Sequence, residues 1–275
     1  MIISPFTPLF FKRHKTDGLA SEYVQVFAPS DVILLEVICA PGEEVNAEVI
    51  NKIDGTTLYN IQFNRWAINE QSVLHFTTMS LSPGEYSVKI EGVGKSEMFR
   101  VTDDMRVLEN TTLIQYANKN NRQRNDAIFL INGMQYFFAF RVPGGFKDGN
   151  WKFSVDNEQF ETAFSDISQL YGLESTQKEF TLGTSAGVPI WFGEMLNRIL
   201  VCSHVYFDGV KYCRKDSSVP ELNEQLEGVN SFVFTVNLQQ SINLDPVIEN
   251  KNQAILRRIA DDYRAVNKSI NRLIQ

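Results

Sequence analysis

Cysteine is scarce in this chain. Three cysteines, Cys39, Cys202 and Cys213, occur among 275 residues, which is too few and too odd a number for a disulfide framework. Cys202 would lie diagonally from Cys213 across a hairpin predicted below, a poor geometry for a crosslink. The sequence therefore fits synthesis in a reducing compartment.

Positive charge is also in short supply, because 26 Lys and Arg residues stand against 33 Asp and Glu, a formal net charge of −7. A nucleic-acid backbone needs clustered Lys and Arg on one face, so nucleic acid is not an expected partner. At the N-terminus an apolar run broken by Pro5 and Pro8 precedes the basic residues, the wrong order for a signal peptide. No apolar run approaches the roughly 20 residues of a membrane span, so we expect no membrane-spanning segment.

The residues that are present predict a globular, mainly β protein of α+β type. Hydrophobic residues make up 43% and charged residues 21%, and the length suits two domains. Residues 21–101 contain short β-branched runs separated by turn signals such as Asp54-Gly55. The sequence Pro83-Gly84-Glu85-Tyr86 leads into an alternating strand, a pattern typical of immunoglobulin-like modules. We predict an N-terminal immunoglobulin-like β-sandwich domain over residues 1–104.

Residues 105–245 predict a second, β-rich domain with one central helix over 188–201. Pro189 suits the first turn of a helix. The apolar residues that follow recur at three- and four-residue spacing and mark one buried face: Phe192, Met195, Leu196, Ile199 and Leu200.

Two hairpins are predicted in this second domain, and one long turn. Asp208-Gly209 and Asn132-Gly133 are both signals for a two-residue turn, and at Asp208-Gly209 we expect a type I′ turn with Gly209 at positive φ. In that register Phe207 faces Val210. Residues 142–149, which include a Pro-Gly-Gly sequence, are predicted to form the long turn.

The last segment, residues 246–275, is predicted to form an amphipathic helix from about 247 to 273. Its apolar residues fall at four-three spacing, and we assign them to oligomer or partner contacts: Leu256, Ile259, Tyr263, Val266, Ile270 and Leu273. With only about three heptads, the segment is short for an isolated coiled coil. Docking onto a partner chain or a second copy and packing back onto its own domain both remain open.

Candidate catalytic and metal-binding patterns are incomplete. Ser185 lies in a G-x-S-x-G sequence before the predicted helix, but between Ser185 and His204, the one later histidine, the only acidic residue is on that helix. A chymotrypsin-like set would need His75 and Asp103 or Asp104 with Ser185, followed by a strand instead of a helix. The three histidines lack a ligand at metal-binding spacing. We therefore predict no catalytic residue, no cofactor and no metal site.

Four segments carry a resemblance to a known family: residues 113–126, 140–151, 181–200 and 205–221. Together they resemble structural proteins of tailed bacteriophages and prophages of gut Bacteroides-type bacteria, crAss-like phages among them. The resemblance covers most of the chain. It implies a virion protein of the neck or tail, made in the host cytoplasm, that forms a homo-oligomeric ring or adaptor and contacts other virion proteins without catalysis.

A different function class also fits the sequence. The N-terminal sandwich could be a glycan- or receptor-binding module, with aromatic residues such as Trp66, Tyr86 and Trp151 lining a sugar-binding face. Packing of these aromatic residues in a core is the favoured interpretation.

Overall fold

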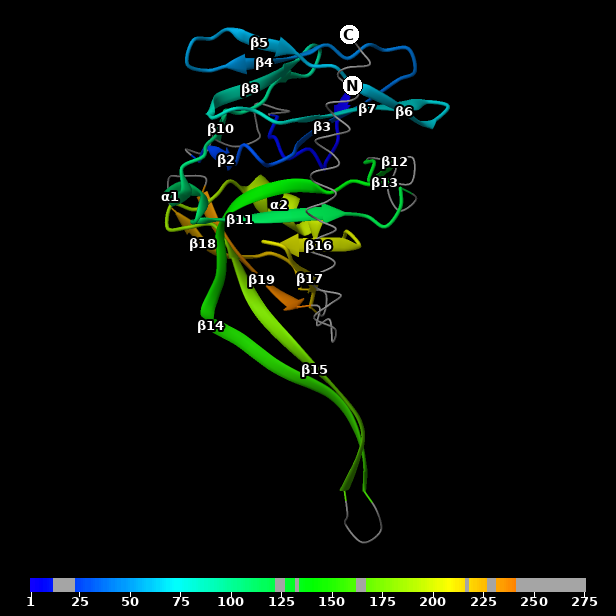
Figure 1. Ribbon diagram of the computed structural model, residues 1–275, viewed down its shortest axis with the longest axis vertical. Coiled ribbons are helices and arrows are strands. Elements are labelled where there is room, and N and C mark those ends of the chain that lie inside the picture. Colours follow the sequence, from blue (N-terminus) through cyan, green and yellow to red (C-terminus); the bar gives the residue numbers. More distant parts are fainter. Residues whose placement is uncertain are drawn as a thin grey trace.

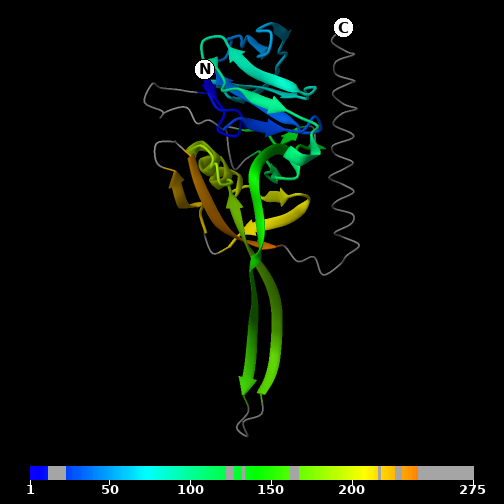
Figure 2. The same cartoon turned by 90° about the vertical axis from the view of Figure 1, so that its left-hand side faces the viewer.

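The computed structural model describes residues 1–11, 23–121, 127–131, 134–161, 167–215, 218–226 and 231–240. Most of these residues lie in strands, so the prediction of a mainly β protein is confirmed. Figure 1 shows a β-sandwich, a barrel beneath it, and a long two-stranded ribbon that projects from the barrel. Figure 2 shows the same three parts after a quarter turn. The predicted C-terminal helix, residues 247–273, lies outside the described residues.

Two sheets face each other in the N-terminal sandwich. The first has the order β1 (Ile2–Ile3), β3 (Ile33–Cys39), β7 (Ser72–Met79) and β6 (Asn64–Asn69). The second has the order β2 (Gln25–Phe27), β10 (Phe99–Val101), β8 (Gly84–Ile90), β4 (Ala47–Asn51) and β5 (Thr57–Asn60), with β9 (Gly94–Lys95) beside β8. Strand β2 pairs in parallel with β10, and the other pairs in these two sheets are antiparallel.

This strand order is that of an immunoglobulin sandwich, with strands A, B, E and D opposite strands G, F and C. Residues at every second position of β3, including Ile33, Leu35 and Val37, enter the core between the sheets. The predicted immunoglobulin-like sandwich is therefore confirmed by its topology.

A tyrosine corner fixes the turn before β8. The Tyr86 hydroxyl donates a 3.0 Å hydrogen bond to the carbonyl oxygen of Ser82. The ring lies so close to Gly84 that a Cβ there would meet the Tyr86 oxygen at 2.7 Å, so this turn requires glycine. Two residues after the tyrosine, where antibody domains have a disulfide cysteine, Val88 is fully buried. Apolar packing takes the place of that crosslink.

The second half of the chain forms a closed barrel. Its strands are antiparallel and form the circuit β14-β11-β16-β17-β19-β15, which closes because β15 pairs with both β19 and β14. The strands are β11 (Thr111–Ala117), β14 (Phe138–Glu161), β15 (Ile167–Leu182), β16 (His204–Phe207), β17 (Val210–Arg214) and β19 (Ser231–Gln240), with β18 (Glu221–Leu226) paired to β19. The remaining short elements are α1 (Met105–Leu108), β12 (Leu130–Ile131) and β13 (Met134–Gln135).

Helix α2 (Ile190–Ile199) packs against the barrel with the face that the spacing predicts. Phe192, Met195, Leu196 and Ile199 are buried, and each is at most 2% exposed. The helix approaches β19 closely at Gly193, where a Cβ would meet the Phe234 ring at 2.9 Å. It begins two residues later than predicted, because extended Pro189, with ψ at 153°, is the residue before its first turn.

The sandwich and the barrel share contacts through β3. Strand β3 is buried on both faces, since Leu34 belongs to the barrel core while its neighbours belong to the sandwich core. The Tyr116 hydroxyl of β11 also donates a 2.8 Å hydrogen bond to the Phe6 carbonyl oxygen. The two halves therefore meet through a buried contact.

The predicted Asp208-Gly209 hairpin is confirmed. Asp208 and Gly209 have φ values of 47° and 84°, as a type I′ turn requires at both positions. Phe207 pairs with Val210, and the Asp208 carboxylate accepts a 2.9 Å hydrogen bond from the backbone N–H of Leu113. At the other signal, β12 and β13 pair across residues 132–133, which themselves lie outside the described ranges.

Candidate assembly surface

The ribbon formed by β14 and β15 leaves the barrel and extends into solvent (Figures 1 and 2). Strand β11 pairs with β14 only up to Pro143, and β19 pairs with β15 only from Gln177 onward. Beyond these points the two strands pair only with each other, from Phe153 opposite Thr176 to Glu161 opposite Ile167. Each strand therefore has an outer edge whose backbone N–H and C=O groups have no strand beside them among the described residues.

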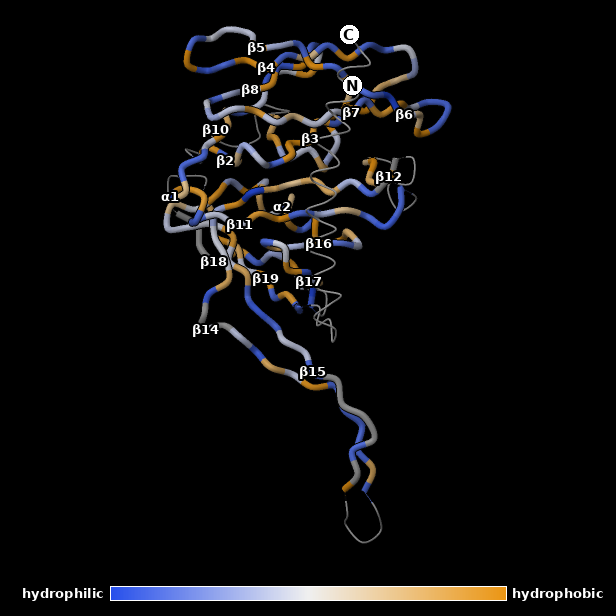
Figure 3. Tube along the Cα trace, in the orientation of Figure 1, coloured by the Kyte–Doolittle hydropathy of each residue, from blue (hydrophilic) through white to orange (hydrophobic). Residues whose placement is uncertain are grey.

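One face of the ribbon is apolar along β14. Trp151, Phe153 and Val155 are 45%, 78% and 57% exposed, and their spacing of two places them on the same face. The intervening residues, Lys152 and Ser154, lie on the opposite face, and both are exposed. Figure 3 shows this alternation of apolar and polar residues along the ribbon. The residues paired with them on β15, Lys178, Thr176 and Glu174, are polar, so the apolar side chains form a row along one strand of this face. Such a row of exposed large apolar side chains is a candidate contact surface.

A cluster of aromatic side chains anchors the base of the ribbon to the barrel. The Phe146 ring stacks on Tyr212 with centroids 4.7 Å apart and lies 5.2 Å from Phe180. The Lys178 ammonium lies 3.8 Å from the Trp151 ring centroid, and burial lowers the pKa of this lysine. This cation–π contact joins the first exposed aromatic residue to the opposite strand.

The prediction of a long turn over residues 142–149 is wrong. These residues belong to β14, and the ladder with β15 shifts register between Phe146 and Trp151. Gly144 has a φ of 113°, and a Cβ there would collide with the Thr181 carbonyl oxygen of the paired strand. Proline and glycine indicated a chain reversal because they usually mark turns. Here they allow a paired strand to bend as it leaves the barrel.

The predicted contact residues of the tail, Leu256, Ile259, Tyr263, Val266, Ile270 and Leu273, lie outside the described residues, and their role stays a prediction. The projecting ribbon was not predicted. Its signal was the alternation over residues 151–155, which cannot be distinguished locally from that of a strand that covers a core.

The residues considered for catalysis are not brought together. His75 lies on β7 in the sandwich, Asp104 caps α1 by accepting a hydrogen bond from the Arg106 N–H, and Ser185 is exposed in the loop before α2. No hydrogen bond or ion pair links Ser185 to His75 or Asp104 in the described structure. Within the same ranges, no cluster of three or more His, Cys, Asp or Glu side chains could hold a metal ion.

Comparison with known proteins adds little to this topology. No family model matches the sequence, and no curated protein matches it. A solved structure described as "Crystal structure of Dpr2 Ig1-Ig2 in complex with DIP-Theta Ig1-Ig3" aligns with 81% of this chain and 88% of its own, at 9% identity and a TM-score of 0.18. At that score the likeness carries no argument about this chain. Neither helix in the described ranges is long and apolar enough to cross a membrane.

Proposed function

We propose that this chain is a structural protein of a bacteriophage particle, a neck or tail ring or adaptor component that works by binding copies of itself. The observation that carries the proposal is the projecting ribbon, with its exposed apolar face at Trp151, Phe153 and Val155. None of the described residues covers this face. A second copy supplies a surface that can cover it.

The two open edges of the ribbon favour a ring over a simple pair. The outer edge of β14 on one copy can pair with the outer edge of β15 on the next, since both edges lack a neighbour in the described structure. Such a contact joins two different surfaces, the β14 edge of one copy and the β15 edge of the next, and every copy carries both edges. Head-to-tail contacts of this kind generate rings when the rotation between copies closes.

The energy of the apolar contact is consistent with assembly in several copies. Burying three side chains of this kind contributes about 5 to 9 kcal/mol at about 1.5 to 3 kcal/mol each. Association of two proteins costs an estimated 4 to 15 kcal/mol. A single contact is therefore marginal, whereas a closed ring gives every copy two contacts.

Placement in a phage particle rests on the sequence resemblance together with this geometry. Negative-stain images of the purified full chain test the assembly part, and rings with a constant number of copies are expected. Mass spectrometry of purified phage particles tests the second part, since the chain should be present in stoichiometric amounts. Rings from a chain that particles lack would support self-assembly and refute the virion role.

A further inference from the structure

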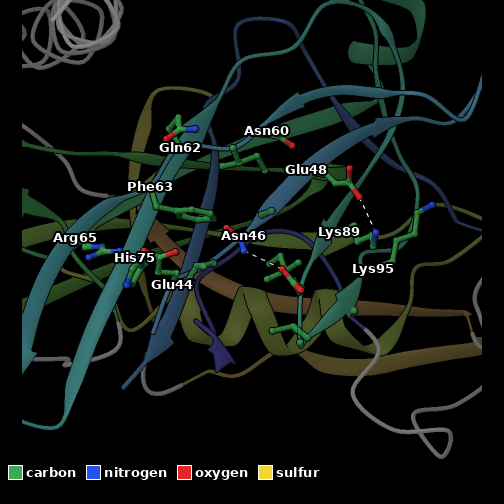
Figure 4. Close-up of a pocket in the computed structure, with 18 residues that line it drawn as sticks. Glu44, Asn46, Glu48, Asn60, Gln62, Phe63, Arg65, His75, Lys89 and Lys95 are labelled. Atoms are coloured by element: carbon green, nitrogen blue, oxygen red, sulfur yellow. Dashed lines mark hydrogen bonds and ion pairs between the residues drawn. The ribbon is translucent and has the colours of Figure 1, made fainter. Parts of the chain in front are cut away.

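The N-terminal sandwich has a groove at the side where β5 crosses to β6, with a volume of about 1400 Å³. Its lining includes the buried apolar residues Val45, Ile61 and Ile90, the last of which belongs to β8. Figure 4 shows two distinct ends. Arg65, His75 and Phe63 gather at one end, and Glu48 with Lys89 lies at the other.

Glu48 and Lys89 at the second end already pair with each other. The Lys89 ammonium lies 2.9 Å from the Glu48 carboxylate, which also accepts a 2.7 Å hydrogen bond from the Thr57 hydroxyl. Between the ends, the Asn46 carboxamide donates a 3.0 Å hydrogen bond to the Glu91 carboxylate. These residues shape the groove without requiring a ligand.

His75 at the first end is different, because it is buried and its imidazole makes no hydrogen bond to any described residue. The side chain is 3% exposed and lines the groove beside Arg65, its strand partner. Its ring makes an edge contact with Phe63, at 6.2 Å between centroids. Burial and the Arg65 charge lower the pKa of His75, so at neutral pH the imidazole offers one donor and one acceptor. The ring nitrogens are not among the fully buried unpaired polar atoms of the described residues, so a ligand in the groove can reach them.

The neighbours of His75 indicate which ligand fits. Gln62 and Arg65 are exposed groove residues that make no side-chain hydrogen bond within the described structure. The Arg65 and Glu44 charges are opposite, so this end does not select a strongly charged ligand. The carboxamide, imidazole and guanidinium groups together offer hydrogen-bond donors and acceptors. They suit a ligand with hydroxyl groups, because a hydroxyl group can both donate and accept a hydrogen bond. The half-buried Phe63 ring supplies an apolar surface for the C–H face of a sugar.

We propose that this groove binds a neutral oligosaccharide, with Gln62, Arg65 and His75 hydrogen-bonding its hydroxyl groups and Phe63 contacting a sugar ring. This site is separate from the ribbon and does not depend on ring assembly. It would give the particle component a second role in attachment to a polysaccharide.

Isothermal titration of the full chain with cellohexaose, mannohexaose and xylohexaose tests the proposal, with hexagalacturonate as an acidic comparison. At least one neutral hexasaccharide should bind. Gln62→Ala and Arg65→Ala should each weaken binding about five-fold or more, the loss expected for a hydrogen bond of about 1 kcal/mol. Gln71→Ala is the matched control, because Gln71 is exposed in the β6–β7 turn and outside the groove.

Three results would overturn the proposal. The first is that none of the neutral hexasaccharides binds at millimolar concentration. The second is that the groove variants bind as tightly as Gln71→Ala. The third is that only hexagalacturonate binds and that added salt abolishes its binding, which would indicate simple attraction between its carboxylates and positive charge on the protein.

Discussion

Asp31 and Arg141 form a two-point ion pair that joins the sandwich to the barrel. The Arg141 Nε lies 2.6 Å from Asp31 Oδ2, and Nη2 lies 2.9 Å from Oδ1. Asp31 belongs to the turn before β3, where it also accepts a 2.8 Å hydrogen bond from the Ala28 N–H, and Arg141 belongs to β14. This pair therefore connects the sandwich to the barrel end of β14, the strand that continues into the ribbon.

Replacing Arg141 by methionine should destabilise the chain by about 3 to 5 kcal/mol, the usual result of removing one partner of a buried ion pair. The Asp31 side chain is 1% exposed and would be left without its cation. Urea unfolding of the two proteins measures the loss. Adding Asp31→Asn to the Arg141→Met variant should recover part of the lost stability. An unchanged urea midpoint for Arg141→Met alone would show that the ion pair does not contribute to folding.

Tyr86→Phe should cost about 1 kcal/mol, because it removes the hydroxyl that donates to Ser82 and leaves the ring in place. Tyr59→Phe is the control. Tyr59 also lies in the sandwich, and its hydroxyl makes no hydrogen bond to a described residue. Thermal or urea unfolding should separate the two variants. Equal losses would mean that the tyrosine corner adds no stability.

Gly209→Val should destabilise the chain by about 1 kcal/mol or more, since a β-branched residue is strained at a φ of 84°. A Cβ at this position meets no atom within 4 Å, so backbone strain should dominate the loss. Gly209→Asn, which tolerates positive φ, should be nearly neutral. If both variants lose the same stability, strain is not the cause.

Acidification should weaken the fold through two histidines. Burial, followed by the Arg65 charge, lowers the pKa of His75, and burial with Lys211 and Lys119 lowers that of His204. Below the ordinary histidine pKa of about 6.5, the unfolded chain then binds more protons than the folded chain, so the free energy of unfolding falls as the pH falls. Unfolding at pH 5.5 and pH 7.5 tests this. The decrease in the free energy of unfolding from pH 7.5 to pH 5.5 should be smaller in a His75→Gln, His204→Gln double variant. An equal decrease would show that other groups cause the pH dependence.

The sequence predicts features whose cause is local. Asp208-Gly209 dictates its turn through backbone conformation, and the spacing of Phe192 and Leu196 dictates the buried face of α2. The turn signal before Tyr86 likewise leads into a strand, β8. The immunoglobulin-like sandwich follows from strands and turns of this kind.

Features that depend on distant partners could not be predicted. Closure of the barrel needs Phe180 of β15 to pair with Val236 of β19, and no local pattern specifies that partner. The burial of Leu34 likewise depends on the barrel that covers β3. Phe153 is the opposite case, because its alternation predicts a buried position, yet none of the described residues covers this side chain.

The molar mass of the full chain in solution, measured by light scattering after size exclusion, tests assembly through the apolar face most directly. Phe153→Lys and Ser154→Lys place the same charge at adjacent exposed positions of one strand, on opposite faces. The wild type and Ser154→Lys should form the same oligomer, and Phe153→Lys should run as a 31.4 kDa monomer. A monomeric wild type, or a Phe153→Lys variant that assembles like the wild type, would contradict the account.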